Sequence, residues 1–135
     1  MQQQLNKKTS MDFTLYALPQ WGPSPTKFAI FLEQLGLTYT AKHLEMNSTD
    51  KKGVKAEDYL KFCPNGGTPT LIDHKNKDFT VWESGAILQY LAHKYDPSQQ
   101  YAGKTIEEQA FVNQWLFFQV TGHSPVQGNL FYTKF

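Results

Sequence analysis

The stretch CPNGGTPTLIDHKNKDFTVWESGA, residues 63–86, constrains the fold of this chain more than any other segment. It contains a Gly-Gly-Thr-Pro turn, then two short β-type runs joined by a polar loop, and finally Glu83-Ser84-Gly85 at the start of a helical pattern. The bond before Pro69 can be trans or cis, and a cis proline at the mouth of a strand leaves the N–H and C=O of the preceding residue, Thr68, free for an extended ligand. The stretch therefore predicts a turn, a hairpin and a helix N-terminus in direct succession.

The helix start within this stretch also indicates which kind of ligand it suits. Unpaired N–H groups and positive dipole potential at a helix N-terminus favour a carboxylate, and the carboxylate of Glu83 beside them favours an ammonium group. A ligand that satisfies both is a small, extended, peptide-like zwitterion. A plain helix start without a ligand is the alternative, because a residue such as Ser84 is common at the beginning of helices.

The first half of the chain has the pattern of a strand, a helix and a second strand. Residues 13–18 (FTLYAL) and 38–44 (TYTAKHL) have the alternation and the residue types of strands. Between them, Ser24 is expected to be a helix N-cap, Pro25 the first helical residue and Gly36 the C-cap. The apolar residues of this helix recur at i, i+3, i+4 and i+7: Phe28, Phe31, Leu32 and Leu35. The spacing predicts a right-handed βαβ unit with parallel strands, and hence an α/β fold.

The second half continues with short elements and then with helices. Residues 56–62 can form a short helix, and residues 70–73 and 79–82 are expected to be the strands of a hairpin. The next helix is expected to start at Ser84 and to end before Asp96.

A capping box, Thr105-Ile-Glu-Glu108, predicts one further helix that extends to about residue 120. Gly122 and Pro125 are expected to break this helix, and the closing stretch PVQGNLFYTKF is strongly apolar for the end of a chain. Three aromatic residues recur along the helix, and we predict that they pack into the core, with a role in a substrate pocket as the second possibility: Phe111, Trp115 and Phe118.

Charge and composition limit the classes of function. Lys and Arg number 13 against 12 Asp and Glu, so the formal charge of +1 gives no argument for binding nucleic acid or an anionic membrane surface. The start MQQQLNKKTS lacks the apolar segment of a signal peptide, and no run approaches the ~20 apolar residues of a membrane span. We therefore predict a flexible tail over residues 1–12 and a cytoplasmic protein. The single cysteine, Cys63, is expected to be buried and structural, and the sequence shows no metal-ligand spacing, phosphate loop or hydrolase triad.

This succession of motifs resembles the thioredoxin-like N-terminal domain of a cytosolic glutathione transferase. The residues that carry the resemblance are Pro64-Asn65-Gly66, Thr68-Pro69, Leu71-Ile72-Asp73 and Trp82-Glu83-Ser84-Gly85-Ala86-Ile87. Within that superfamily, WLFFQ at residues 115–119 and GHSP at residues 122–125 are similar to the fungal nitrogen-regulator-like branch, which is also called nu-class-like. The resemblance covers residues 13–135.

The resemblance implies both the fold and the domain organisation. A thioredoxin-like βαβ-ββα domain with a mixed four-stranded sheet is expected over residues 13–96. Residues 97–135 are expected to form a linker and the first part of an all-helical domain, which is truncated. The resemblance also implies that Pro69 is cis, that glutathione is the co-substrate with no separate cofactor, and that the protein is a homodimer.

The resemblance further assigns roles to individual residues. Ser24 stands where the family places the residue that faces the glutathione sulfur, although this branch usually has Asn there, and the alternative is that Ser24 is only an N-cap. Half-ionising a thiol of pKa ~8.5 at pH 7 requires roughly 2 kcal/mol of preferential thiolate stabilisation. Thr68 is expected to pair through its backbone with the cysteinyl part of glutathione, unless Pro69 is a structural turn alone. Glu83 and Ser84 are expected to hold the γ-glutamyl ammonium and carboxylate.

The glycyl end of the predicted site matches the family less well. Gly67 and Val54 stand where the branch often carries a basic residue and a histidine. Lys52 or Lys55 is therefore the candidate for the glycyl carboxylate, with solvated linker lysines as the alternative.

His123 and Trp115 are the candidates for the acceptor site, and a capping or core role is the alternative for each. The expected function is that of a glutathione transferase, which activates the glutathione thiol for conjugation to a small electrophile or for reduction of a disulfide. Two alternatives stay open: a non-catalytic interaction protein on the same fold, as the fungal nitrogen regulator is in binding a transcription factor, and a truncated inactive product.

Overall fold

The computed structural model describes residues 11–18, 23–46 and 48–134. Most of the tail predicted over residues 1–12 therefore lies outside the described residues. No helix in the described ranges is both long and apolar enough to cross a membrane. The same ranges contain no cluster of three or more His, Cys, Asp or Glu side chains that could hold a metal ion.

The first three elements form the predicted βαβ unit. Strand β1 (Phe13–Ala17) pairs in parallel with β2 (Tyr39–His43), and helix α1 (Pro23–Gln34) connects them. Helix α1 begins at Pro23, so Ser24 lies inside the first turn and the predicted N-cap position is wrong by about two residues. Prolines fit this first turn, because its N–H groups have no partner within the helix.

A hairpin completes a mixed four-stranded sheet. Strands β3 (Thr70–Asp73) and β4 (Phe79–Trp82) are antiparallel and have the predicted bounds, and the loop between them contains a short 3-10 helix, η1 (His74–Asn76). Strand β3 also pairs with β1 in antiparallel fashion, which gives the order β2-β1-β3-β4. The sheet thus has the architecture that the resemblance implied.

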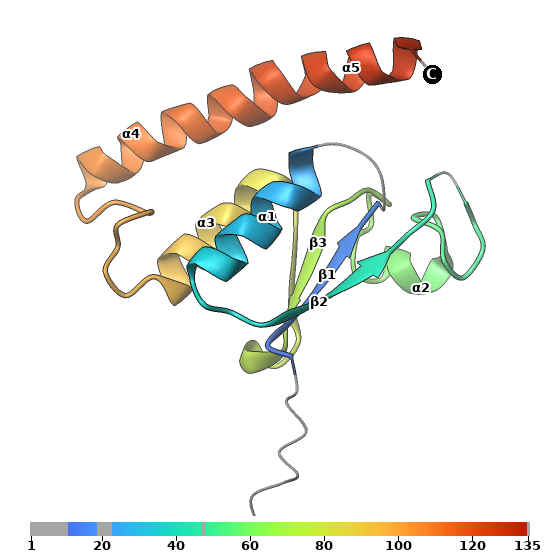
Figure 1. Cartoon of the computed structure of the whole chain (residues 1–135), viewed down its shortest axis with the longest axis horizontal. Coiled ribbons are helices and arrows are strands. Elements are labelled where there is room, and N and C mark those ends of the chain that lie inside the picture. Colours follow the sequence, from blue (N-terminus) through green and yellow to red (C-terminus); the bar gives the residue numbers. More distant parts are fainter. Residues whose placement is uncertain (1–10, 19–22, 47, 135) are drawn as a thin grey trace, which may run out of the picture.

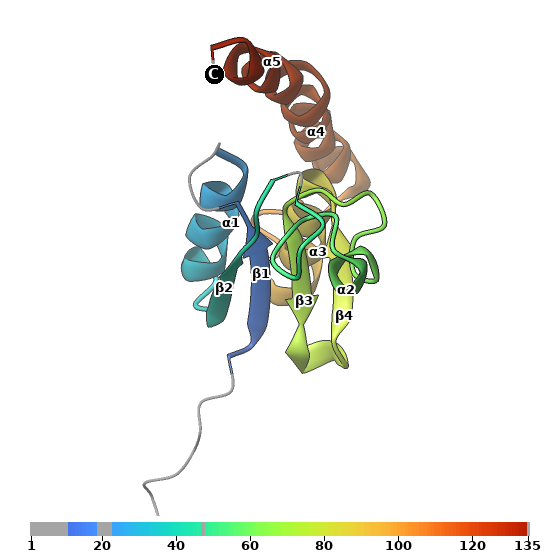
Figure 2. The same cartoon turned by 90° about the vertical axis from the view of Figure 1, so that its right-hand side faces the viewer.

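Helices cover the two faces of the sheet unequally. Helices α1 and α3 (Ser84–Tyr95) lie on one face, and the short helix α2 (Glu57–Leu60) lies on the other (Figures 1 and 2). The core under α1 and α3 contains the fully buried Phe28 and Leu32, with Phe31 and Leu35 partly buried against it, which confirms the predicted apolar face of α1. The second apolar cluster includes Cys63, which is buried as expected, together with Leu44, Val54, Ala56 and Tyr59.

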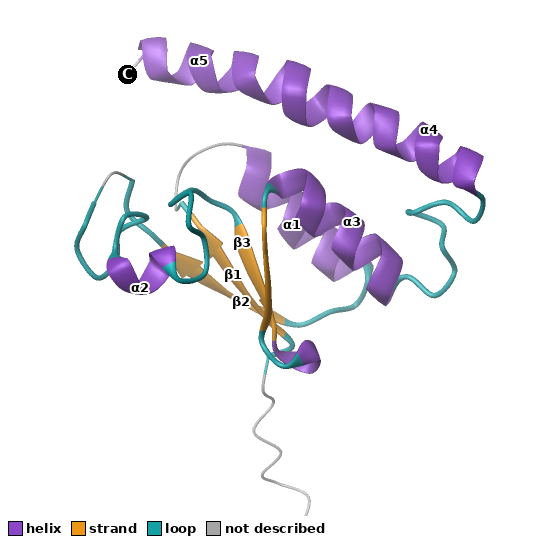
Figure 3. Ribbon diagram, turned by 180° about the vertical axis from the view of Figure 1, so that it is seen from behind, coloured by secondary structure: helices purple, strands orange, loops and turns teal. Residues whose placement is uncertain are grey.

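The predicted capping box is present at the start of helix α4 (Ile106–Phe117). The Glu108 N–H donates to Thr105 Oγ1 over 3.2 Å, and the Thr105 N–H donates to the Glu108 carboxylate over 3.3 Å. The predicted break after this helix is wrong, because the chain continues through a π-helix, η2 (Phe118–His123), into α5 (Ser124–Lys134) as one long rod (Figure 3). The wider π turn relieves the clash of a proline ring with the preceding turn, and so the helix passes residues 122 and 125.

The rod packs against α3 through a different face from the one predicted. Phe111, Trp115 and Phe118 are 60%, 58% and 63% exposed, so they are not core residues. The contacting face is formed instead by Val112, Leu116 and Val120, which adjoin α1 and the start of α3. Helix α4 has apolar residues on both faces, and periodicity alone does not decide which face packs.

Candidate functional site

The register of the hairpin brings the two halves of the predicted site together. Thr70 on β3 lies opposite Trp82 on β4. The Thr68-Pro69 turn directly precedes β3 and the Glu83-Ser84 pair directly follows β4, so both lie at the same edge of the sheet, on strands about 4.8 Å apart. Residues that are distant from each other along the chain can therefore contact one ligand.

The turn before β3 has the predicted cis bond and is held by a tyrosine. The Thr68-Pro69 peptide is cis. The Tyr59 hydroxyl donates to the Gly67 carbonyl over 2.5 Å and lies 2.8 Å from Thr70 Oγ1, so it spans the turn from both sides. Burial raises the pKa of Tyr59, which keeps this hydroxyl protonated. Among the described residues, no hydrogen bond uses the backbone of Thr68.

Glu83 at the start of α3 has a positive φ angle, and its carboxylate does not cap the helix. Glu83 is the N-cap residue and has φ of 73° and ψ of 126°, a conformation that costs a residue with a side chain roughly 1–3 kcal/mol. Its side chain is exposed and does not cap the helix, while its carbonyl accepts from the Ile87 N–H over 3.0 Å. Ser84 follows as the first helical residue and is half-buried. The Glu83 carboxylate is therefore available to a cation beside the helix start.

Ser24 lies in the helix that follows β1, and β1 ends at the same edge of the sheet as the predicted site. Tyr16 near the end of β1 lies opposite Thr70, and the chain then reaches α1, where Ser24 occupies the first turn. The Ser24 side chain lies outside the described part of the structure. Its sulfur-facing role stays a prediction.

Lys27, one helical turn after Ser24, has no predicted role but contacts the predicted site. Its Nζ donates to Ser84 Oγ over 3.2 Å and to Gln119 Oε1 over 2.9 Å. Burial lowers the pKa of Lys27. Its spacing of three residues from Ser24 was the signal that could have placed it on the face of α1 next to the site.

The two lysines predicted for the glycyl end lie in different places. Lys55 donates to the Asn65 carbonyl over 3.0 Å, so it lies on the turn that leads to Thr68. Lys52 lines a separate hollow of about 580 Å³ beside the end of β2, together with Tyr16. Both lysines are exposed.

The two candidates for the acceptor site are exposed on the rod. His123 is the last residue of η2 and lies one turn after Gln119. Trp115 contacts Phe118 edge to face, with ring centroids 6.0 Å apart. No hydrogen bond or ring contact among the described residues joins either of them to Glu83 or Ser84.

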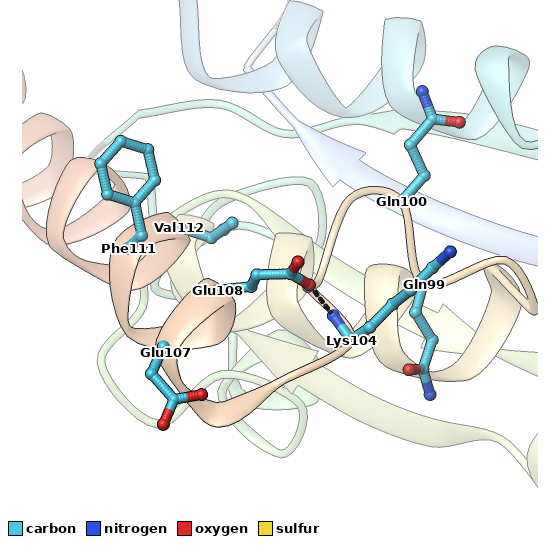
Figure 4. A pocket seen from close by; sticks show the side chains of 8 residues that line it. Gln99, Gln100, Lys104, Glu107, Glu108, Phe111 and Val112 are labelled. Atoms are coloured by element: carbon cyan, nitrogen blue, oxygen red, sulfur yellow. Dashed lines mark hydrogen bonds between the residues drawn. The ribbon is translucent and has the colours of Figure 1, made fainter.

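A further hollow lies away from the predicted site. It has a volume of about 570 Å³ and lies between the loop after α3 and the start of α4 (Figure 4). The Glu108 carboxylate at its wall accepts from the Lys104 N–H over 2.6 Å, as part of the helix cap. None of the predicted site residues lines this hollow.

Comparisons with known proteins agree with this geometry. The family model for the glutathione S-transferase N-terminal domain matches residues 11–93. Glutathione S-transferase 1 of Schizosaccharomyces pombe is 40% identical over 117 residues, which cover 86% of this chain and 49% of that protein. Protein URE2 of Eremothecium gossypii is 35% identical over 116 residues, which cover 84% of this chain and 32% of that protein.

Solved structures give the same result. The glutathione transferase URE2P6 from Phanerochaete chrysosporium, in complex with oxidised glutathione, has 47% identity and a TM-score of 0.75, and the match covers 85% of this chain and 51% of that one. Ure2p in complex with glutathione has 34% identity and a TM-score of 0.77, with the same coverage.

The sheet, the proline turn and the helix start define a thioredoxin-like domain of the glutathione transferase type. The chain belongs to the glutathione S-transferase family, and the fungal proteins that it resembles include Ure2-like members. It spans about half of the length of the first curated relatives that it matches.

Proposed function

We propose that this chain binds glutathione at the sheet edge where β3 begins and β4 ends. Thr68 pairs through its backbone with the cysteinyl part, Glu83 binds the γ-glutamyl ammonium, and Ser84 binds the γ-glutamyl carboxylate. The observation that carries the proposal is the register of Thr70 opposite Trp82, which brings these residues to one edge.

The same proposal assigns the glycyl end to Lys55. An extended tripeptide spans about 10 Å, enough to reach from the start of α3 past the proline turn. Lys55 lies on the turn at residues 65–66, whereas Lys52 lies beside β2 at the far end of the strand order. Val54 is 4% exposed within the α2 cluster and does not contribute a polar group.

In the proposed reaction the Ser24 hydroxyl donates to the glutathione sulfur and stabilises its thiolate. The thiol proton passes to solvent, and the sulfur lone pair forms a bond to the electrophile as the leaving group departs. Attack on a disulfide instead gives a mixed disulfide and a free thiol. Residues 13–96 form the binding domain in this proposal, and residues 97–135 form a linker and begin a helical domain. A homodimer and a cytoplasmic location stay predictions.

The test compares the wild-type chain with Ser24→Ala in two measurements, glutathione binding by calorimetry and conjugation of 1-chloro-2,4-dinitrobenzene. Both proteins should bind glutathione, and conjugation should fall about tenfold or more in the variant, because one donor to the developing charge is lost. Ser48→Ala removes a serine from the loop between β2 and α2 and should change neither result. Absence of glutathione binding in a chain that is folded by circular dichroism would contradict the proposal.

A non-catalytic interaction protein on the same fold is the second candidate. The observation that favours it is the exposed row of aromatic side chains on the rod, Phe111, Trp115 and Phe118. If the wild type and Ser24→Ala both bind glutathione and both fail to conjugate, this second function is supported.

A further inference from the structure

Lys27 is a half-buried cation whose hydrogen-bond partners are neutral. Its Nζ contacts Ser84 Oγ and Gln119 Oε1, and it lies 5.6 Å from the centre of the Phe28 ring. The ion pairs among the described residues are Lys61–Asp58, His74–Asp78 and Lys75–Asp12, so Lys27 belongs to none of them. Partial burial of a charge without a counter-ion is unfavourable, which points to an anionic group that binds beside it.

The contact between Lys27 and Ser84 also fixes the direction in which the serine can donate. An ammonium group has no lone pair, so Lys27 donates and Ser84 Oγ accepts. The serine hydroxyl keeps its own proton for another acceptor. Because Ser84 is the first residue of α3, that proton and the unpaired N–H groups of the first turn are available to the same carboxylate.

Gln119 holds Lys27 from the side of the rod. Its Oε1 accepts from Lys27, while its Nε2 donates to Ser124 Oγ over 2.7 Å, so both ends of the amide are occupied. The π turn of η2 aligns residues five apart, and the Ser124 N–H accordingly donates to the Gln119 carbonyl. The π-helix therefore presents Gln119 toward the start of α3.

We propose that Lys27 is a positioning residue for the γ-glutamyl carboxylate of glutathione. Lys27 orients the Ser84 hydroxyl as a donor to this carboxylate and places a positive charge next to that hydroxyl. Gln119 in turn holds the Lys27 side chain in place. This inference rests on the proposed function and adds to it a direct link between the rod and the glutathione site. Three groups then recognise the γ-glutamyl end of glutathione: the Glu83 carboxylate, the Lys27 ammonium group and the Ser84 hydroxyl.

The test measures dissociation constants by NMR titration for two ligands, with the 135-residue chain. One ligand is glutathione, and the other is γ-aminobutyryl-cysteinyl-glycine, which lacks only the carboxylate of the γ-glutamyl residue. Lys27→Met should weaken glutathione binding about tenfold or more, because a charge-assisted interaction is lost, and should leave binding of the analogue unchanged. Lys27→Arg should recover part of the loss, and Gln119→Leu should give a smaller loss for glutathione alone.

Lys94→Met is the matched control, because Lys94 lies in the last turn of α3 and should affect neither ligand. Equal weakening of both ligands by Lys27→Met would show a structural role and overturn the inference. Unchanged glutathione binding in Lys27→Met would also overturn it and leave the proposed function standing. If the folded wild type binds neither ligand, the proposed function fails and this inference fails with it.

Discussion

The phenol of Tyr95 donates a hydrogen bond of 2.5 Å to Oδ2 of Asp73, a carboxylate with no exposed surface at the end of β3. Tyr90 donates to the same oxygen over 2.6 Å, and the Lys75 N–H donates to Oδ1 over 2.9 Å. Hydrogen bonds to both oxygens compensate for the burial of the carboxylate. This cluster joins the second half of α3 to the last residue of β3, at the end of the hairpin opposite the predicted site.

Replacing this carboxylate should destabilise the fold in a graded way. Asp73→Ala should lower the free energy of unfolding by about 3 kcal/mol, because two phenols and one N–H lose their acceptor in a buried place. Asp73→Asn keeps an acceptor and should cost roughly half as much. Urea unfolding followed by circular dichroism measures both. Equal losses in the two variants would contradict a role for the shared acceptor.

The same cluster predicts a loss of stability at high pH. Burial, and then the hydrogen bond to Asp73, raises the pKa of Tyr90 to about 12 and raises that of Tyr95 in the same direction. In the unfolded chain these phenols ionise near pH 10, so between pH 10 and 12 the folded state holds more protons than the unfolded state. The contribution of these two phenols to the free energy of unfolding should therefore be fully present below pH 10, and it should decrease as the pH rises toward 12.

Urea unfolding at a series of pH values, with phenolate absorbance at 295 nm, measures this dependence. A Tyr90→Phe, Tyr95→Phe double variant should show a shallower slope over the same range. An identical slope in the double variant would mean that other groups cause the loss.

Tyr59→Phe should weaken both the fold and the glutathione site. The variant leaves the Gly67 carbonyl and Thr70 Oγ1 without their partner, at a cost of about 1–2 kcal/mol. Because Gly67 directly precedes Thr68, glutathione affinity should fall as well. Tyr39→Phe is the control, since the Tyr39 hydroxyl donates to the exposed Glu33, and it should change stability by less than about 0.5 kcal/mol. Comparable effects of the two variants on unfolding and on calorimetric binding would contradict the prediction.

Substitutions on the two faces of α4 should differ in effect. Leu116 adjoins Gly85 at the start of α3, so Leu116→Ala should cost about 1–2 kcal/mol and increase amide exchange in the rod. Trp115 is 58% exposed, and Trp115→Ala should change stability by about 0.5 kcal/mol or less. Hydrogen exchange and thermal unfolding measure the difference. A larger effect at Trp115 would mean that the aromatic face is the one that packs.

Most of the thioredoxin-like domain could be predicted because its signals are local. Pro69 before β3 and Glu83-Ser84 after β4 mark the hairpin, and the strand bounds match the prediction. The capping box at Thr105 is equally local, since its two hydrogen bonds lie within one turn. The path of the rod could not be predicted in this way, because Pro125 has the local signature of a break, whereas the helix continues past it by way of the π turn.

The sequence by itself determined the order and type of the elements in the sheet domain, the cis proline as one of two possibilities, and the residue types of a zwitterion site. Only the tertiary structure decided which face of α4 packs and which side chains complete the site. Lys27 meets Ser84 across 57 residues and Gln119 across 92. Periodicity reports neighbours within a few residues, whereas such contacts depend on how helices pack on the sheet, and that packing is set by the whole core at once.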